Sequence, residues 1–190
     1  MWRILLIFFL SVCYRPALLA APQERAELFA GYSAMYVRTS TTSNLQGWNA
    51  SVAWAIRPRI EGVADFGGYY GSHNSRGNYD YRLHSFLFGP RLSTELAKVR
   101  LFTHLLAGAA RESTQVAVRI TNEQFQVGLQ LLDFSSVGFA LAAGAGLDLK
   151  ATPRISVRLL QADWLYISSD SFQEPKNERP RISMGVVVRF

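Results

Sequence analysis

The sequence predicts an all-β protein, a transmembrane antiparallel up-and-down β-barrel of eight strands. Three observations favour this fold. The chain has 190 residues, 49% of them hydrophobic and only 18% charged, whereas an ordinary soluble domain has about 25% charged residues. After the N-terminus, no apolar run reaches the roughly 18 residues that a spanning helix needs. Instead, apolar and polar residues alternate with a period of two, which gives each extended segment one apolar face.

The N-terminal segment has the features of a secretory signal peptide. Arg3 precedes the apolar run 4–13, and small residues follow up to Ala20, as in an export signal. We therefore expect residues 1–20 to be a signal peptide and residues 21–190 to form a single barrel domain. Cleavage would remove the only cysteine, Cys13, and lower the formal net charge from +6 to +4. The mature chain could then form neither a disulfide nor a cysteine metal site.

The first four predicted strands span residues 27–37, 47–57, 60–70 and 80–91. In the second, Trp48, Val52 and Ile56 alternate with polar or small residues. In the third, Glu61 and Asp65 lie on the face opposite the apolar one. In the fourth, the pattern leaves open which face points inward.

The other four predicted strands span residues 99–110, 139–149, 154–166 and 180–190. In the seventh, the alternation slips after Leu159, and a β-bulge there would turn Gln161 and Asp163 inward. The last strand alternates throughout, and its apolar face carries Ile182, Met184, Val186, Val188 and Phe190. Most of these segments are long enough for a tilted strand, which crosses a bilayer with about 9–11 residues.

The connections between these strands alternate in length. Short links are expected at 57–59, 92–98 and 150–153, and long ones at 38–46, 71–79, 110–138 and 167–179. Outer-membrane barrels have short periplasmic turns and longer external loops. We therefore expect the bacterial outer membrane as the location, with both termini in the periplasm.

Aromatic residues gather near the ends of the predicted strands. In a membrane barrel such rings form a girdle at each interface. The members predicted for this girdle are Tyr32, Tyr36, Trp48, Tyr69, Tyr70, Trp164 and Tyr166. The non-apolar face is rich in Gly, Ala and Ser, which suits a narrow barrel interior better than a soluble surface.

Three segments resemble small bacterial outer-membrane barrels of the OmpA/OmpX-like group: 27–33, 88–91, and the alternating C-terminal run 181–190, which ends in phenylalanine. The resemblance implies the barrel fold for nearly the whole mature chain. It also implies that the barrel-assembly machinery recognises the last strand, with Phe190 as the assembly signal.

Charged residues on the inward faces are expected to form a polar network in the lumen. Its predicted members are Glu61, Asp65, Arg82, Arg100, His104, Asp148 and Arg158. Isolated buried charges are costly, so we expect these groups to pair and to fill the barrel. The alternative is a narrow porin-like path for ions or small solutes.

Catalysis and cofactors are not expected. His84 and Ser85 are adjacent on a strand, so they would face opposite ways and could not form a nucleophile–base pair. Three histidines on separate segments without paired spacing do not indicate a metal site, and no cofactor is predicted. A lipid-modifying outer-membrane enzyme remains the second alternative function.

The long connection 110–138 is the best candidate for a functional segment. Residues 115–120 and 125–132 alternate enough to form a hairpin beyond the membrane, and such a ladder could bind an extracellular partner by strand addition. A ten-stranded barrel that uses these segments is the alternative architecture. We thus predict a non-enzymatic, monomeric barrel with a structural or surface-interaction role, in contact with outer-membrane lipids and not with nucleic acid.

Overall fold

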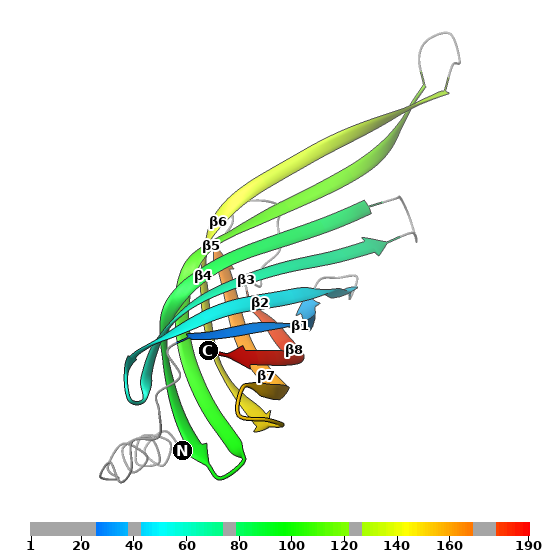
Figure 1. Ribbon diagram of the computed structural model, residues 1–190. Helices are drawn as coiled ribbons and strands as arrows, with labels where there is room; N and C mark the ends of the chain where they lie inside the picture. The colour runs from blue at the N-terminus through cyan, green and yellow to red at the C-terminus, as the bar shows by residue number, and fades with distance from the viewer. Residues whose placement is uncertain (1–25, 38–42, 74–78, 122–126, 169–177) are drawn as a thin grey trace, which may run out of the picture.

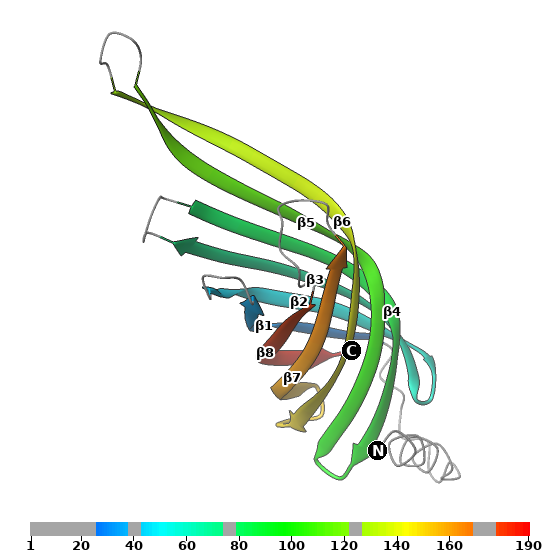
Figure 2. The same cartoon turned by 180° about the vertical axis from the view of Figure 1, so that it is seen from behind.

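Eight antiparallel strands close into a barrel in which every strand pairs with its neighbour in sequence and β1 pairs with β8 (Figure 1; Figure 2). This computed structural model describes residues 26–37, 43–73, 79–121, 127–168 and 178–190. The strands are β1 (Ala26–Val37), β2 (Ser43–Arg57), β3 (Ile60–His73), β4 (Tyr79–Leu96), β5 (Val99–Thr121), β6 (Val127–Lys150), β7 (Ile155–Ser168) and β8 (Glu178–Arg189). The eight-stranded fold is confirmed, and the ten-stranded alternative is wrong.

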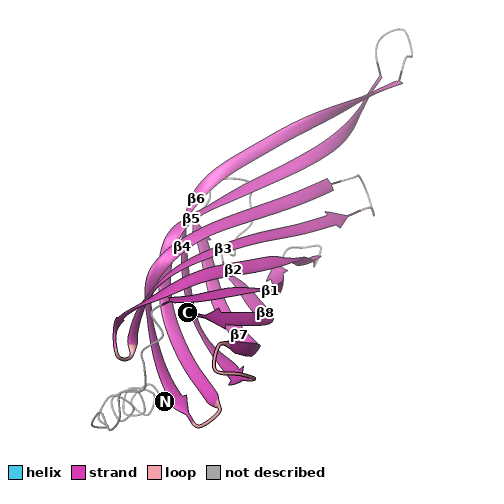
Figure 3. Cartoon of the chain, viewed as in Figure 1, coloured by secondary structure: helices cyan, strands magenta, loops and turns pink. Residues whose placement is uncertain are grey.

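Almost all of the described residues belong to these strands (Figure 3). Among them, no helix is both long enough and apolar enough to cross a membrane. The predicted signal peptide, residues 1–20, lies outside the described residues.

The strand bounds differ from the predicted ones mainly in β4, β5 and β6. β4 continues to Leu96, which pairs with Val99, so Ala97 and Lys98 alone make the turn. Ala97 has a φ of 54°, as the tight two-residue hairpin turns require. β5 and β6 have 23 and 24 residues and form a hairpin that projects well beyond the other strands (Figure 1). Most of the predicted connection 110–138 is therefore paired β-strand, and the predicted hairpin within it is confirmed.

The outer face of the barrel is apolar, and the interior holds most of the charge. Leu105, Val186 and Trp54 are about half exposed, whereas Arg91 and Arg181 are almost completely buried. A water-soluble protein has the opposite distribution, because ionised side chains are rarely fully buried. This inversion suits a barrel whose outer surface contacts hydrocarbon.

The sequence pattern does not fix which side chains of β4 face inward, nor those of β7 after Leu159. The structure shows both. In β4, Leu83, Ser85 and Leu87 point inward. In β7, the register shifts between Arg158 and Gln161, and Gln161 is buried. The predicted bulge is thus confirmed, and it turns the polar residues that follow it into the lumen.

Two glycines of β6 make room for large lumen side chains from the neighbouring strands. A Cβ atom on Gly144 would overlap the carboxylate of Asp163, and one on Gly146 would overlap the ring of Phe102. Glycine at these positions therefore serves close packing across the sheet.

Replacing Gly146 by valine should destabilise the barrel by about 1–3 kcal/mol, because the added atoms collide with the Phe102 ring and overpack the lumen. The matched control is Ala145→Val, at the preceding residue of β6, whose side chain faces outward. Urea unfolding in lipid vesicles measures both variants. Equal unfolding free energies would contradict the packing role of Gly146.

Candidate functional site

The largest polar cluster of the lumen converges on Glu27, the second residue of β1. Its Oε1 lies 2.8 Å from Nη2 of Arg91 and 3.1 Å from Nη2 of Arg158. Its Oε2 lies 2.6 Å from Nη1 of Arg100 and 3.2 Å from Nε of Arg189. These four arginines belong to β4, β7, β5 and β8. One carboxylate thus connects four other strands across the barrel.

Two further carboxylates complete this cluster, which we call the Glu27 cluster. Glu61 of β3 accepts hydrogen bonds from Arg91, at 2.5 Å, and from Arg100. Asp148 of β6 accepts a bond of 2.8 Å from Nε of Arg158. Seven of the eight strands therefore contribute a charged side chain.

Aromatic rings enclose one arginine of the Glu27 cluster. The Arg158 guanidinium lies 4.2 Å from the ring centre of Phe29 and 4.3 Å from that of Phe102. Such cation–π contacts are strongest when the cation is desolvated. Arg158 thus packs against two rings, and its nitrogen atoms donate to the carboxylates of Glu27 and Asp148 and to the amide oxygen of Gln161.

A second cluster surrounds Arg181 of β8, whose side chain is completely buried. Its guanidinium contacts Asp163 at 2.6 Å and Asp65 at 2.9 Å, so it joins β7 to β3. His104 of β5 contacts the other oxygen of Asp163 at 2.8 Å. Asn49 donates to Asp65 at 3.0 Å. The partners of this buried charge therefore come from across the lumen.

Toward the long-loop end, the lumen becomes apolar. The buried side chains there include Met35, Leu45, Leu83, Leu165 and Ile167. Nearer still to the long loops, Arg179 of β8 pairs with Glu112 of β5 at 2.6 Å and donates to the hydroxyl of Tyr81 at 2.7 Å. From the short-turn end to the long-loop end, the lumen thus holds paired charges, an apolar layer and a further ion pair.

This arrangement can hold the strands together, but it offers little to a passing solute. Arg91, Arg158, Arg181 and Arg189 are among the largest fully buried side chains. Separating a buried ion pair leaves uncompensated charge, which costs about 3–5 kcal/mol. Passage along the lumen would require separating several of these pairs.

Most of the predicted lumen residues lie inside the barrel. Glu61 and Arg100 belong to the Glu27 cluster with Asp148 and Arg158, while Asp65 and His104 contact the Arg181 cluster. Arg82 is the exception. It is exposed on the outer face of β4, because inward-facing Leu83 sets the parity of that strand. Its predicted place in the lumen network is wrong.

The prediction missed four residues at the centre of these clusters, namely Glu27, Arg91, Arg181 and Arg189. Asp163 lies in the lumen, where the predicted β7 bulge places it. The polar face of the last strand already contains Arg181 and Arg189, so alternation alone could have located them. Alternation in β1 places Glu27 opposite Leu28 in the same way. No sequence signal indicates that Glu27 would receive four arginines, since those contacts arise from strands far apart in the chain.

The aromatic residues divide between the two faces of the sheet. Six members of the predicted girdle are exposed on the outside: Tyr32, Tyr36, Trp48, Tyr70, Trp164 and Tyr166. Tyr69 is wrongly assigned to the girdle. It is fully buried and its hydroxyl accepts a bond of 3.2 Å from Arg181. Phe190 is exposed at the chain end, and its role in assembly stays a prediction.

The described histidines have different surroundings. The His84 ring lies edge-on to Tyr70, with Nε2 at 3.4 Å from its hydroxyl, whereas the neighbouring Ser85 is buried. The two therefore face opposite ways, as predicted. His104 stacks on Phe102 beside Asp163. In the described part of the chain, no group of His, Cys, Asp and Glu residues is arranged to hold a metal ion.

The solved structures that resemble this fold include bacterial outer-membrane barrels. Ail, the attachment invasion locus protein of Yersinia pestis, superimposes with a TM-score of 0.61 at 17% identity, over 88% of this chain and 100% of Ail. Neisserial surface protein A superimposes with a TM-score of 0.61 at 14% identity, over 87% and 97% of the two chains. A major outer membrane protein of Thermus thermophilus gives 0.57 at 11% identity, over 87% and 99%.

These likenesses confirm the resemblance to small outer-membrane barrels at the level of fold. No protein-family model matches the chain, and no curated protein matches it in sequence.

Replacing Glu27 by glutamine should destabilise the folded barrel by about 3 kcal/mol, because four arginines lose a shared buried carboxylate. The matched control is Glu95→Gln. Glu95 pairs with Lys150 at 2.6 Å on the surface, where such a pair contributes about 0–1 kcal/mol. Urea unfolding in vesicles measures both. Similar losses in the two variants would show that the Glu27 cluster does not stabilise the barrel.

Proposed function

From the premise that this chain has the eight-stranded fold of outer-membrane barrels, we propose that it is a non-enzymatic surface-interaction protein of the bacterial outer membrane. Its lumen serves structure, and its projecting β5–β6 hairpin is the interaction element. The observation that carries the proposal is the contrast between a lumen filled with paired charges and a hairpin that extends beyond every other strand (Figure 1).

The location follows from the outer face of the barrel. Its apolar side chains would be exposed to water in a soluble protein, which costs free energy. In a membrane they contact hydrocarbon instead, and this cost is absent. We place the short turns and both chain ends in the periplasm, as is usual for this architecture. The remaining proposed partners are the lipids around the barrel and the assembly machinery, which would recognise the strand that ends at Phe190. We expect the inserted protein to be a monomer.

The hairpin offers a free sheet edge. In the described structure, β6 residues 127–138 pair with β5 alone, since pairing with β7 begins at Phe139. Exposed edges are usually protected by lysine, proline or bulges. The segment 127–138 contains no Lys, Arg or Pro and a single acidic residue, Asp133. An edge of this composition suits the addition of a partner strand.

The fold neighbours are consistent with such a role. Ail is an attachment invasion locus protein and has been crystallised with sucrose octasulfate, a heparin analogue. Because the sequence identity is low, the ligand of this chain is not inferred from Ail. No specific contact favours the channel or the lipid-modifying enzyme as a second function.

A first prediction concerns conductance. The purified protein should insert into planar bilayers without producing stable current steps, because paired arginines and an apolar layer occupy the lumen. Insertion is verified independently by heat-modifiable migration on a gel. Reproducible ohmic steps from the monomer would contradict the structural role of the lumen and favour the channel.

A second prediction concerns the hairpin. Val116 pairs with Leu132, so residues 117–131 can be replaced by Asn-Gly, a two-residue hairpin turn. The unfolding free energy should stay within about 0.5 kcal/mol of the parent value, because the removed described residues pair only with one another. Bacteria that display the shortened protein should lose adhesion to mammalian cell monolayers, whose surface proteins could supply a partner strand.

The control for this experiment is a strain that displays the parent protein at equal surface density. Adhesion by the parent strain that persists undiminished in the shortened variant would contradict the assignment of the interaction to the hairpin.

A further inference from the structure

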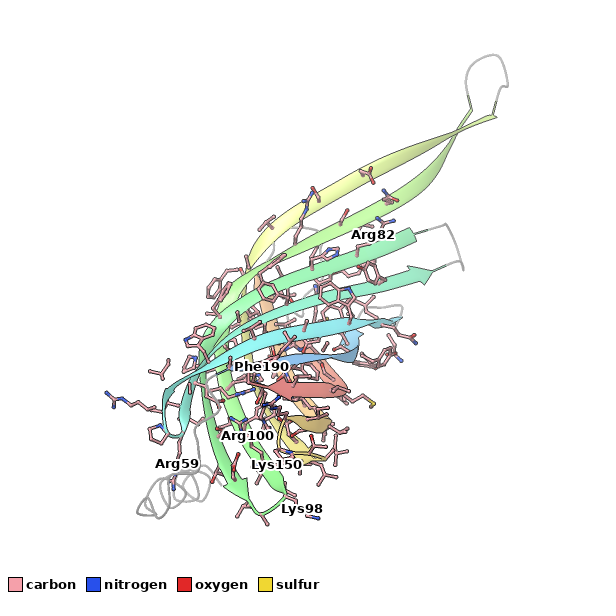
Figure 4. All side chains as sticks on the ribbon, in the orientation of Figure 1. Arg59, Arg82, Lys98, Arg100, Lys150 and Phe190 are labelled. Carbon is pink, nitrogen blue, oxygen red and sulfur yellow. The ribbon has the colours of Figure 1, made fainter. Side chains whose placement is uncertain are left out.

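The short turns at one end of the barrel all carry basic residues. Arg57 ends β2 and Arg59 lies in the turn between β2 and β3, and Lys98 lies in the turn between β4 and β5. Lys150 and Arg154 flank the turn between β6 and β7. Arg59, Lys98 and Lys150 lie at the same end of the molecule, away from Arg82 (Figure 4). We call these five residues the basic collar.

Little acidic charge accompanies the basic collar. In the described part of these turns and the adjoining strand ends, Glu95 is the one exposed carboxylate side chain, and it pairs with Lys150 at 2.6 Å. The nearby Glu27 cluster adds to the positive potential, because its four arginines face three carboxylates. The described side chains at the short-turn end therefore carry a net positive formal charge, both in the basic collar and in the Glu27 cluster.

The basic collar borders directly on the apolar outer face. Ile56, which is 60% exposed, precedes Arg57, and Ile155, which is 43% exposed, follows Arg154. Leu96, 56% exposed, lies two residues before Lys98. Basic side chains next to the hydrocarbon boundary can reach lipid headgroups while their stems cover apolar surface. Arg57, Lys98 and Arg154 thus lie where the apolar outer face ends.

We propose that the basic collar binds the headgroups of anionic phospholipids in the leaflet that surrounds the short-turn end. The inference rests on the proposed membrane insertion and adds the chemical class of the lipid and its site. Cations near a membrane surface attract anionic lipids and lose this attraction as salt screens it. The continuity of the collar with the lipid-facing surface favours a lipid over an acidic protein, which would need a face directed away from the membrane.

Tryptophan quenching can locate such lipids. Trp54 pairs with Ala26 and Gly62 near the short turns, whereas Trp164 pairs with Ala143 and Pro180 farther along the barrel. Two reporter proteins retain either Trp54 or Trp164, with the other tryptophans replaced by phenylalanine. Each is reconstituted in phosphatidylcholine vesicles in which one-third of the lipid is phosphatidylglycerol. Bromine is carried on the acyl chains of either the phosphatidylglycerol or an equal amount of phosphatidylcholine.

Brominated phosphatidylglycerol should quench Trp54 more than brominated phosphatidylcholine does, with a relative association constant of about two or more. The preference should be weaker at Trp164 and should fall in 0.5 M salt. In the Trp54 reporter, R57Q/R154Q should abolish the preference. The matched pair R82Q/R111Q, which removes two exposed arginines from the outer face of β4 and β5, should leave it intact.

Equal quenching of Trp54 by the two brominated lipids would overturn the proposal, as would loss of the preference in R82Q/R111Q but not in R57Q/R154Q. Heat-modifiable migration on a gel shows whether each reporter is folded in the vesicles. It therefore distinguishes a failure of lipid binding from a failure of the proposed function. A chain that does not insert and fold in vesicles contradicts the membrane location, whereas an inserted chain without lipid preference contradicts the basic collar alone.

Discussion

Backbone hydrogen bonding imposes the strictest demand on this chain. In hydrocarbon, an unpaired N–H or C=O group has no water to bind, so a sheet must close without a free edge. The pairing of β1 with β8, from Glu27 opposite Arg189 to Met35 opposite Arg181, provides this closure. With eight strands the resulting tube is narrow, and its interior must be filled by side chains.

The filling of the lumen follows from the same closure. The sheet turns its apolar face to lipid, so polar side chains point into a space with little room for water. Charges there are stable only when paired, and the pairs that form connect strands on opposite sides of the barrel. Glu27 and Arg181 each bind partners from several strands. Side-chain electrostatics thus reinforces the shape that the backbone requires.

In the β5–β6 hairpin that projects beyond the barrel, the sheet no longer closes on itself. The outer parts of β5 and β6 keep only each other as partners in the described structure, which water permits and hydrocarbon would not. At the opposite end, the turns are short and basic, and they follow closely on the apolar face. The two ends of the molecule therefore differ in structure: one projects as a two-stranded hairpin, and the other has short turns with basic residues.

Period-two alternation was sufficient to predict the barrel, the number of strands, the β7 bulge and most of the residues that face the lumen, because side-chain direction in a strand is a local property. It could not place Arg82, since one residue of slip exchanges the two faces and only pairing with neighbouring strands sets the register. Tyr69 has the parity of Glu61 and Asp65 in β3, so alternation does place it in the lumen, and its position near the strand end led to the wrong assignment. Alternation also could not identify Glu27 as the centre of the charged cluster. Its arginine partners are distant in sequence, and they meet only because a closed sheet brings opposite walls within reach of a side chain.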